Sequence, residues 1–385
     1  MANTTPASIT PLHDQLEQLA AFEPVDLPVL SLYLDLTADQ HGRDRYDQFV
    51  RKTLAERMKS LPPRSPELES FERDATKIRD YLGTLDPSIN GLALFACAGA
   101  GDFFEAIPLE APVDQHWLFV GAVPHIYPLA RLVDQYPRYA AVVLDTNAAR
   151  IFVFGLSRVE RATEITNEKT RRGQMGGWSQ NRYQRHVDHM RSQHVKEVVD
   201  TLGQLVTTEQ IAHIIIAGDE VVVPMVRQQL PKPLAEKVID TIKLDRGADE
   251  STVLQATLEL LRTKDATTDA EVVEELITQW RSGGLGVAGP EATLQALTMG
   301  QVDQLVIAGT PATLKRVQKL PEGSAPGDVQ VDTSAPQGTV DPERVKLADE
   351  LVTRAEQTAA RIRFIENSEL LADLGGVGAL LRFRI

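Results

Sequence analysis

The sequence predicts a mixed α/β protein built from three domains. Its 385 residues are enough for two or three domains that each bury a hydrophobic core. Segments in which apolar residues recur at helical spacing alternate with short apolar runs through most of the chain, which indicates sheets covered by helices. Breaks in this pattern place the domains at residues 1–135, 136–266 and 267–385.

The first domain mixes strands and helices in an α+β arrangement. The apolar run at 27–36 (LPVLSLYLDL) is typical of a buried strand, and Phe71, Ile78 and Leu82 recur at helical spacing. The predicted elements are strands at 27–36, 91–97, 102–109 and 117–120 and helices at 43–58 and 65–85. No motif with recognisable chemistry lies in this domain.

The middle domain begins with a hairpin, because two β-branched and aromatic runs flank the polar pair Thr146 and Asn147. A long helix follows, in which residues such as His194 and Val198 repeat at intervals of three or four. The predicted elements are strands at 140–145, 149–154, 213–217 and 238–244 and helices at 179–202, 222–229 and 250–263. Asp145, Asp219 and Glu220 follow strands and are interpreted as caps and turn residues.

The last domain opens with a helical stripe between Val272 and Trp280, which Gly283 and Gly284 end. Further helices are predicted at 290–299, 344–359 and 368–374, and strands at 304–309, 361–365 and 379–385. Residues 321–342 are rich in Pro, Gly, Ser and Asp, which predicts a loop. Alternating arginines along the last strands are typical of a solvated sheet edge; they are Arg361, Arg363, Arg382 and Arg384.

Composition excludes several classes of protein. No apolar run approaches the ~20 residues that cross a bilayer, and the N-terminal residues lack the basic and apolar regions of a secretory signal. The single cysteine, Cys97, excludes an intramolecular disulfide framework and a Cys-rich zinc site. We therefore expect a protein of the reducing cytoplasm, without a cofactor or a metal.

Charge is distributed unevenly along the chain. The formal net charge is -14, which by itself argues against a polyanionic partner. Residues 169–196 reverse this balance with a local charge of +6, because they contain seven basic residues and one acidic residue. The basic residues are Lys169, Arg171, Arg172, Arg182, Arg185, Arg191 and Lys196. Such a reversal predicts a site for a polyanion, since Lys and Arg neutralise phosphates and release counterions.

The same segment opens with a glycine-rich stretch around a tryptophan. Gly173, Gly176 and Gly177 have no side chains to pack, which favours a protruding tip. Trp178 lies at that tip and suits stacking on a nucleobase, while Ser179 suits an N-cap of the following helix. The alternative interpretation is a solvated glycine-rich loop that leads into an ordinary basic surface helix.

This segment resembles the tip of the middle domain of archaeal and eukaryotic class-I translation release factors. There a Gly-Gly-Gln-Ser sequence is followed, after two residues, by Arg and an aromatic residue at the start of a basic helix. Here the sequence is Gly176-Gly177-Trp178-Ser179, followed at the same spacing by Arg182, Tyr183 and then Arg185. Residues 284–309 and 371–381 similarly resemble the family's C-terminal domain, an L7Ae-like α/β/α sandwich. The bacterial members, which include Balon-type ribosome hibernation factors, are the most similar set.

The resemblance implies ribosome binding in the A site, with the tip directed towards the peptidyl-transferase centre. The residues that it assigns to RNA binding are Arg171, Arg172, Gly176, Gly177, Trp178, Ser179, Arg182, Tyr183, Arg185 and Arg191. It also implies a contact of the C-terminal domain with the stalk base or with a translational GTPase such as elongation factor Tu. No decoding motif of the family is recognisable in the first domain.

One departure from the family concerns catalysis. Release factors use the tip glutamine to place water against peptidyl-tRNA, and here Trp178 stands in that position. An indole has one donor and no acceptor, so it cannot orient a water as a carboxamide does. We therefore favour occlusive binding, as in ribosome hibernation. Gln174 and Gln180 are the catalytic candidates of the first alternative, a peptidyl-tRNA hydrolase acting in termination or rescue. A general RNA-binding module is the second alternative.

Two further motifs are interpreted as structural. Gly284, Gly286 and Gly289 fit a dinucleotide-binding spacing, but that motif requires a preceding strand and here a helix with its glycine stop precedes it. A tight turn is therefore favoured. His186, His189 and His194 point in too many directions around a helix to ligate one metal ion, and His194 fits a core position.

Overall fold

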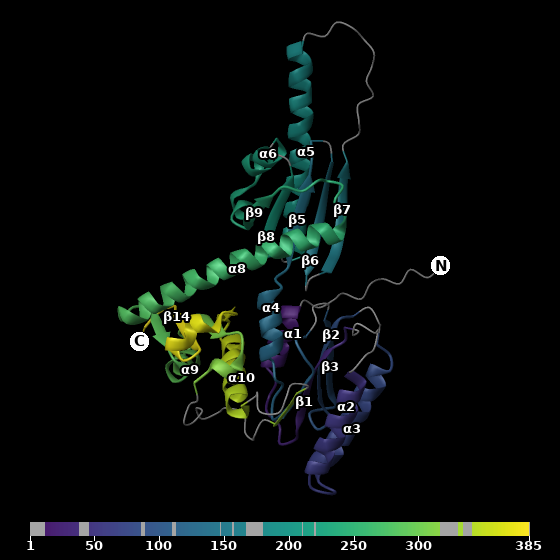
Figure 1. The fold of residues 1–385 in the computed structure, drawn as a ribbon, viewed down its shortest axis with the longest axis vertical. Coiled ribbons are helices and arrows are strands. Elements are labelled where there is room, and N and C mark those ends of the chain that lie inside the picture. The colour runs from purple at the N-terminus through teal and green to yellow at the C-terminus, as the bar shows by residue number, and fades with distance from the viewer. Residues whose placement is uncertain are drawn as a thin grey trace. The chain divides into compact units, whose positions relative to one another are not determined.

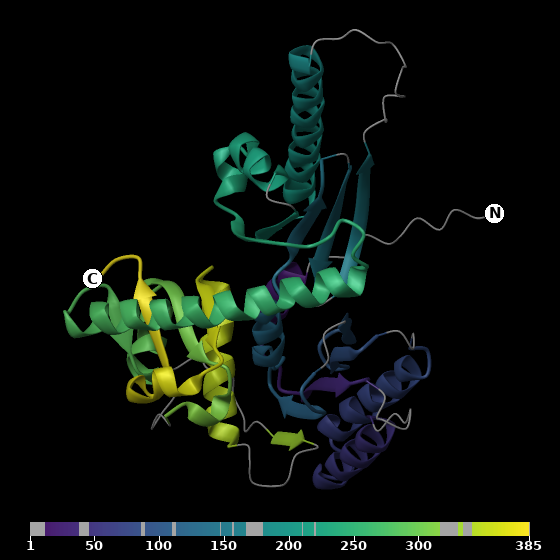
Figure 2. The ribbon, with the colours of Figure 1, turned by 45° about the horizontal axis from the view of Figure 1, so that its top comes forward.

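A computed structural model of the chain has the mixed α/β architecture that the sequence predicts (Figures 1 and 2). It describes residues 12–37, 46–85, 89–109, 113–146, 148–155, 158–166, 180–209, 211–218, 221–315, 330–333 and 341–384. The chain divides into two compact units, Met1–Gln135 with Thr268–Ile385, and Tyr136–Thr267. We call these the outer unit and the middle unit and describe each by itself.

The outer unit contains an antiparallel sheet of order β12-β4-β1-β2-β3. Its strands are β1 (Val29–Asp35), β2 (Gly91–Cys97), β3 (Phe103–Leu109), β4 (Trp117–Gly121) and β12 (Gln330–Thr333). Helices α2 (Tyr46–Ser60) and α3 (Pro66–Leu82) bury one face, where Leu32 and Leu94 meet Leu54 and Phe71. Ser65 caps α3 by accepting the Leu68 N–H, which fixes where that helix begins.

Strand β12 is a correction to the sequence analysis, which predicts a loop throughout 321–342. Residues Gln330–Thr333 pair antiparallel with β4, from Gln330 opposite Val120 to Thr333 opposite Trp117. Four residues are too few to show a β period amid Pro, Gly and Ser, and the strand exists because the β4 edge supplies the backbone partners.

A second sheet of the outer unit has the order β10-β14-β11-β13. Its strands are β10 (Gly286–Ala288), β11 (Val302–Ala308), β13 (Arg361–Ile365) and β14 (Val377–Leu381). Residues Val273 and Leu276 of α8 (Glu250–Arg281) pack on the face that contains Val306. Helices α9 (Pro290–Thr298) and α10 (Pro342–Gln357) contact each other and contact β11 and β13, respectively. The short 3₁₀ helices are η1 (Pro311–Thr313) and η2 (Ser368–Leu374).

A buried polar cluster joins the two sheets of the outer unit through α1 (Leu12–Ala20), α4 (Tyr127–Gln135) and α10. One carboxylate oxygen of Asp349 in α10 accepts the backbone N–H groups of Ile126 and Tyr127 at 2.8 and 3.1 Å, and its distance to His125 Nδ1 is 3.2 Å. Asp349 therefore caps α4 from a helix that lies far away in the sequence. The hydroxyl of Tyr127 donates to the Ala308 carbonyl at 2.5 Å.

The middle unit contains a sheet of order β7-β6-β5-β8-β9. Its strands are β5 (Tyr139–Leu144), β6 (Ala148–Gly155), β7 (Arg158–Thr166), β8 (His213–Gly218) and β9 (Val238–Ile242). Helices α5 (Gln180–Thr208) and α6 (Val222–Gln229) cover one face, where Val142 and Ile216 meet Val198 and Leu202. The first half of α8 covers the other face with Val253 and Leu261. A short helix, α7 (Lys232–Ala235), precedes β9.

Other elements also differ from the sequence-based expectations, and α1, α4, α7 and β10 have no predicted counterpart. Helix α8 is continuous from Glu250 to Arg281, where two separate helices are predicted, because residues 264–269 (KDATTD) contain no Gly or Pro to stop it. Strand β7 is not predicted at all, since its sequence (RVERATEIT) is mostly polar. The last strand is Val377–Leu381 rather than 379–385, and it begins directly after Gly375 and Gly376, which both have positive φ.

One buried carboxyl in helix α3, which packs on the first sheet, makes stability depend on pH. Asp74 is fully buried, one of its oxygens accepts the Ala98 N–H at 3.1 Å and the other has no partner. Burial raises the pKa of Asp74 to about 6, against the smaller lowering effect of that hydrogen bond. Because the folded pKa lies above the unfolded value, the folded state binds the proton more tightly. Stability therefore falls as pH rises from about 4 through 6.

We expect Asp74→Asn to raise the free energy of unfolding at pH 8 by about 1 to 2 kcal/mol and to change it little at pH 4. The amide keeps an acceptor for Ala98 and removes the buried charge. Urea unfolding at the two pH values measures this difference. Asp80→Asn, on the exposed side of the same helix, is the matched control. An equal effect of Asp74→Asn at both pH values would contradict the assigned titration.

Candidate functional site

The predicted tip lies outside the described residues. This applies to Arg171, Arg172, Gln174, Gly176, Gly177, Trp178 and Ser179. Helix α5 begins at Gln180, directly after this segment, and contains Arg182, Tyr183, Arg185 and Arg191. The structure therefore places the last four residues of the predicted RNA-binding set on one helix, and the function of the whole set stays a prediction.

Helix α5 is long compared with the sheet that it covers. Its 29 residues extend over about 43 Å at 1.5 Å per residue, and Figures 1 and 2 show its N-terminal part continuing past the ends of the strands. Among its described side chains, burial begins at His194 and continues through Val195, Val198 and Leu202. Gln229 of α6 donates to the Ser192 hydroxyl at 3.2 Å. The helix is thus anchored by its C-terminal half.

The histidines of this helix form no metal site among the described residues. His194 is 1% exposed and its two ring nitrogens have no hydrogen-bond partner, whereas His189 is exposed. His194 therefore occupies the core position that its spacing indicates, and the side chain of His186 is not described. Across the described ranges, no three His, Cys, Asp or Glu side chains gather in a way that would hold a metal ion.

Asp145 acts as a turn residue, as predicted. Its Oδ1 accepts the Ala148 N–H at 2.8 Å and its Oδ2 accepts Arg246 Nε at 2.9 Å. Asp219 and Glu220 lie outside the described residues. The glycine motif of the last domain corrects the prediction of a tight turn, because Gly286 begins strand β10 and Gly289, with a φ of +87°, directly precedes α9. A Cβ on Gly286 would lie 2.6 Å from the Trp280 nitrogen, so close backbone approach requires glycine there.

The alternating arginines are only partly solvated, which corrects the sequence analysis. Arg363 is half-buried and donates to Asp269 at 2.8 Å, and Asp134 lies 3.8 Å away on α4. Arg382 donates to the Ala359 carbonyl at 2.6 Å. Arg363 of the edge strand β13 therefore lies against two carboxylates of its own unit, because α4 of the first domain packs beside β13.

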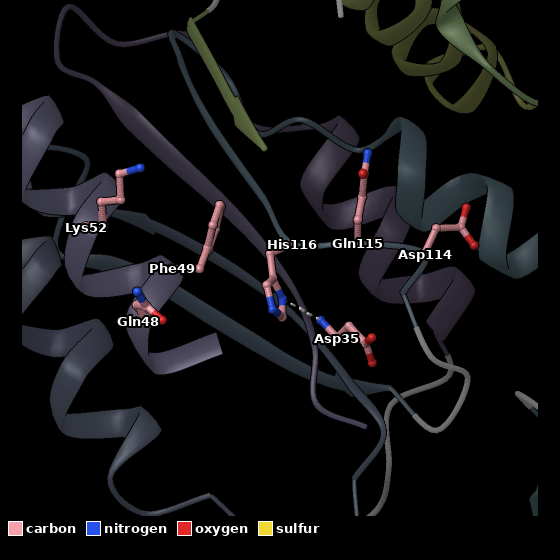
Figure 3. A pocket seen from close by; sticks show the side chains of 7 residues that line it. All are labelled: Asp35, Gln48, Phe49, Lys52, Asp114, Gln115 and His116. Carbon is pink, nitrogen blue, oxygen red and sulfur yellow. Dashed lines mark hydrogen bonds between the residues drawn. The ribbon is translucent and has the colours of Figure 1, made fainter. Parts of the chain in front are cut away.

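A small open pocket of about 430 Å³ lies in the first sheet of the outer unit (Figure 3). Its walls come from the end of β1, one side of α2 and the segment before β4. The lining residues are Asp35, Gln48, Phe49, Lys52, Asp114, Gln115 and His116. Sequence reasoning missed this site because its residues lie in three separate segments and follow no motif.

His116 is the most constrained side chain of the pocket. Its Nδ1 accepts the backbone N–H of Asp35 at 3.2 Å, which leaves the proton of the neutral ring on Nε2. Burial lowers the pKa of His116, with a partial opposing effect of the Asp35 carboxylate. The ring of Phe49 lies beside it, with 5.2 Å between ring centroids. The imidazole is therefore neutral at physiological pH.

Exposed large apolar side chains concentrate at one end of the second sheet. Of the five exposed large hydrophobic residues among the described residues, four lie here; they are Trp280, Leu285, Met299 and Phe383. Backbone contacts bring their segments together, since Leu381 N–H donates to the Leu285 carbonyl at 2.9 Å and Arg382 N–H to the Gln301 carbonyl at 2.8 Å. We call these four residues the apolar end patch.

Comparison with known proteins identifies the family. The family model described as "Bacterial archaeo-eukaryotic release factor family 10" matches residues 124–262, and the model "eRF1 domain 3" matches residues 266–385. The two matches follow each other along the chain, and the first includes the entire basic segment. The chain belongs to the bacterial archaeo-eukaryotic release factor family.

Two curated relatives and one solved structure are similar to parts or most of the chain. Peptide chain release factor subunit 1 of Methanobrevibacter smithii is 21% identical over 330 residues, which cover 77% of this chain and 79% of that protein. The protein pelota homolog of Haloarcula marismortui is 25% identical and covers 49% of this chain and 50% of its own. Among solved structures, archaeal translation termination factor aRF1 is 18% identical, with 97% of both chains covered and a TM-score of 0.27.

The family assignment makes this chain a release-factor-like translation factor. The family assignment confirms the resemblance that the tip and C-terminal motifs indicate. Neither family model covers the first 123 residues, which contain the pocket of Figure 3. None of the described helices combines the length and apolar character needed to cross a membrane.

Proposed function

We propose that this chain is a cytoplasmic ribosome-protection factor that binds the A site and directs Gly176, Gly177 and Trp178 towards the peptidyl-transferase centre. One observation carries the proposal: α5 places Arg182 and Arg185 near its N-terminal end, ahead of the half that packs on its own sheet. Cations held there are positioned for the phosphates of rRNA. Arg171, Arg172 and Arg191 extend the same basic segment.

A protective rather than a hydrolytic role follows from the chemistry of the tip. Trp178 stands where the family's catalytic glutamine stands, and an indole has no acceptor for a water proton. Its flat ring instead suits stacking on a nucleobase. Such a factor occupies the site in idle ribosomes, which is hibernation, and it leaves a peptidyl-tRNA ester intact.

Sedimentation of purified 70S ribosomes with the chain tests the binding. We expect the chain to migrate with the 70S particles at physiological salt and to dissociate as salt rises, because phosphate contacts weaken with ionic strength. A chain that stays at the top of the gradient would overturn the proposal. Equal retention on unrelated structured RNA would favour the general RNA-binding alternative.

A release assay on stalled nascent-chain complexes separates protection from hydrolysis. The chain is expected to leave the peptide on its tRNA. Peptide release that disappears in both Gln174→Ala and Gln180→Ala would replace protection with peptidyl-tRNA hydrolysis, because only then does the chemistry depend on the two candidate carboxamides.

We further propose that the apolar end patch contacts a translational GTPase of the elongation factor Tu class. Solvent exposure of Trp280, Leu285, Met299 and Phe383 is 41 to 49% each, which is unusual for so many large apolar side chains in one place. The same gradients test the contact: the GTPase should be recovered in the 70S fractions together with the chain. Its absence from fractions that contain the chain would contradict this partner.

A further inference from the structure

The pocket in the first sheet separates two opposite charges by an aromatic wall. Figure 3 shows Lys52 and Asp35 at opposite ends of the pocket, with the rings of Phe49 and His116 between them. A ligand that fits this order has an anionic group at one end, a flat middle and a hydrogen-bond donor at the other end. The arrangement is independent of the basic segment, which lies in the other unit.

The aromatic wall is held in place by its own contacts. The two ring planes are inclined by 34°, and the backbone N–H of Asp35 fixes the imidazole. Phe49 is partly buried against the core below it, so its ring does not have to be ordered by the ligand. A preformed wall of this kind favours stacking on a flat heteroaromatic group, because little conformational entropy is lost on binding.

The polar groups of the pocket are available to a ligand. Asp35 Oδ1 accepts the N–H and hydroxyl of Thr37 at 3.0 and 2.6 Å. Among the described residues, no donor reaches Asp35 Oδ2, and Lys52 and Gln48 have no hydrogen-bond or ion-pair partner. Asp114, by contrast, is already paired with Arg131 at 3.0 Å. One lysine and one carboxylate oxygen therefore remain for recognition.

We propose that this pocket binds a nucleotide, with its base on the wall formed by Phe49 and His116, its phosphate on Lys52 and its exocyclic amine on Asp35. A carboxylate accepts hydrogen bonds and donates none, so it pairs with the amino groups of adenine or cytosine. Uracil has no exocyclic amine; it presents a single ring N–H between two carbonyl oxygens, which the carboxylate repels, so it pairs with Asp35 less well. The pocket therefore selects amino-bearing bases over uracil.

The volume of about 430 Å³ lies in the range of small-molecule sites. The nucleotide has two sources, a free mononucleotide or an unstacked residue of an RNA strand, and both present the same chemistry. This inference goes beyond ribosome association, since neither the tip nor α5 contributes to the pocket.

Calorimetric titration of the full chain with AMP, CMP and UMP, and with the hexanucleotides of A, C and U, tests the proposal. We expect saturable binding that is about tenfold tighter for the A or C probe than for the U probe. Binding of the mononucleotides identifies a free nucleotide as sufficient. Binding of the hexanucleotides alone, with the same base preference, identifies an RNA strand. In either case, the imidazole NMR resonance of His116 should shift on saturation.

Variants separate this pocket from the basic segment. Lys52→Gln is expected to weaken binding of every probe about tenfold, while Lys59→Gln, an exposed lysine further along α2, leaves binding unchanged. Asp35→Asn should retain binding and lose the preference against U, because an amide can donate as well as accept. Phe49→Leu should weaken binding through lost stacking, with an unchanged circular dichroism spectrum as the control for folding.

The proposal is overturned if no probe binds saturably, or if binding is insensitive to Lys52→Gln and shows no preference against U. The second result would assign RNA binding to residues 169–196 instead. Sedimentation of Lys52→Gln with 70S ribosomes separates the nucleotide pocket from ribosome binding by the basic segment. A variant that loses nucleotide binding and still migrates with ribosomes supports two independent sites.

Discussion

Asp349→Ala is expected to destabilise the outer unit by about 3 to 5 kcal/mol, because it leaves several buried polar groups without a partner at once. The N–H groups of Ile126 and Tyr127 lose the carboxylate oxygen that accepts them, and the imidazole of His125 loses the carboxylate 3.2 Å away. All of these groups are almost completely buried, since His125 is 4% exposed and Asp349 8%. A shift of the urea unfolding midpoint measures the loss.

Two substitutions control this prediction. Asp349→Asn keeps an oxygen that accepts both N–H groups, so it should cost much less than the alanine variant. Glu343→Ala removes an exposed carboxylate from the same helix and should change stability by no more than about 0.5 kcal/mol. If Asp349→Ala unfolds at the same midpoint as Glu343→Ala, the cluster does not hold α4 to α10.

The double variant Arg182→Glu with Arg185→Glu is expected to abolish migration with 70S ribosomes at physiological salt. Each reversal removes a phosphate contact and adds a repulsion. The slope of the logarithm of the binding constant against the logarithm of the salt concentration should therefore become shallower by about 2, one for each lost contact. Both residues lie ahead of the buried half of α5, so the fold of the middle unit should be preserved. Gradient sedimentation over a series of salt concentrations measures both effects.

The matched control makes the same change of net charge elsewhere on the middle unit. Arg227 and Lys232 are exposed, and Arg227→Glu with Lys232→Glu should still migrate with the ribosome. Equal loss in both double variants would mean that total charge rather than the basic helix directs binding. Full retention of the Arg182 and Arg185 variant would mean that this helix is not the anchor.

Much of the fold is predictable where the sequence has a strong period of its own. The β5 and β8 runs are continuously apolar because both faces of their sheet are covered, and α5 shows its core face through Val198 and Leu202. Elements that depend on distant partners are missed. Strand β12 exists only because of the β4 edge, and polar β7 only because β6 pairs with it.

Of the two candidate sites, one can be predicted from the sequence and the other cannot. The basic segment is continuous in sequence, so its charge and glycine spacing can be recognised without a structure. The family assignment supports the resemblance to release factors that they indicate. The nucleotide pocket brings Asp35 and Phe49 together with His116, which lies 81 positions after Asp35, and the sheet places them side by side. Arg363 is predicted to be a surface residue because its partners, Asp269 and Asp134, lie almost 100 and more than 200 positions away, respectively.

A cryo-EM map of the chain bound to 70S ribosomes tests the proposed mode of action most directly. The expected map shows the middle unit in the A site, with Trp178 at the peptidyl-transferase centre and Arg182 and Arg185 against rRNA phosphates. A map in which the chain binds the ribosome elsewhere, with residues 176–178 away from that centre, would contradict it.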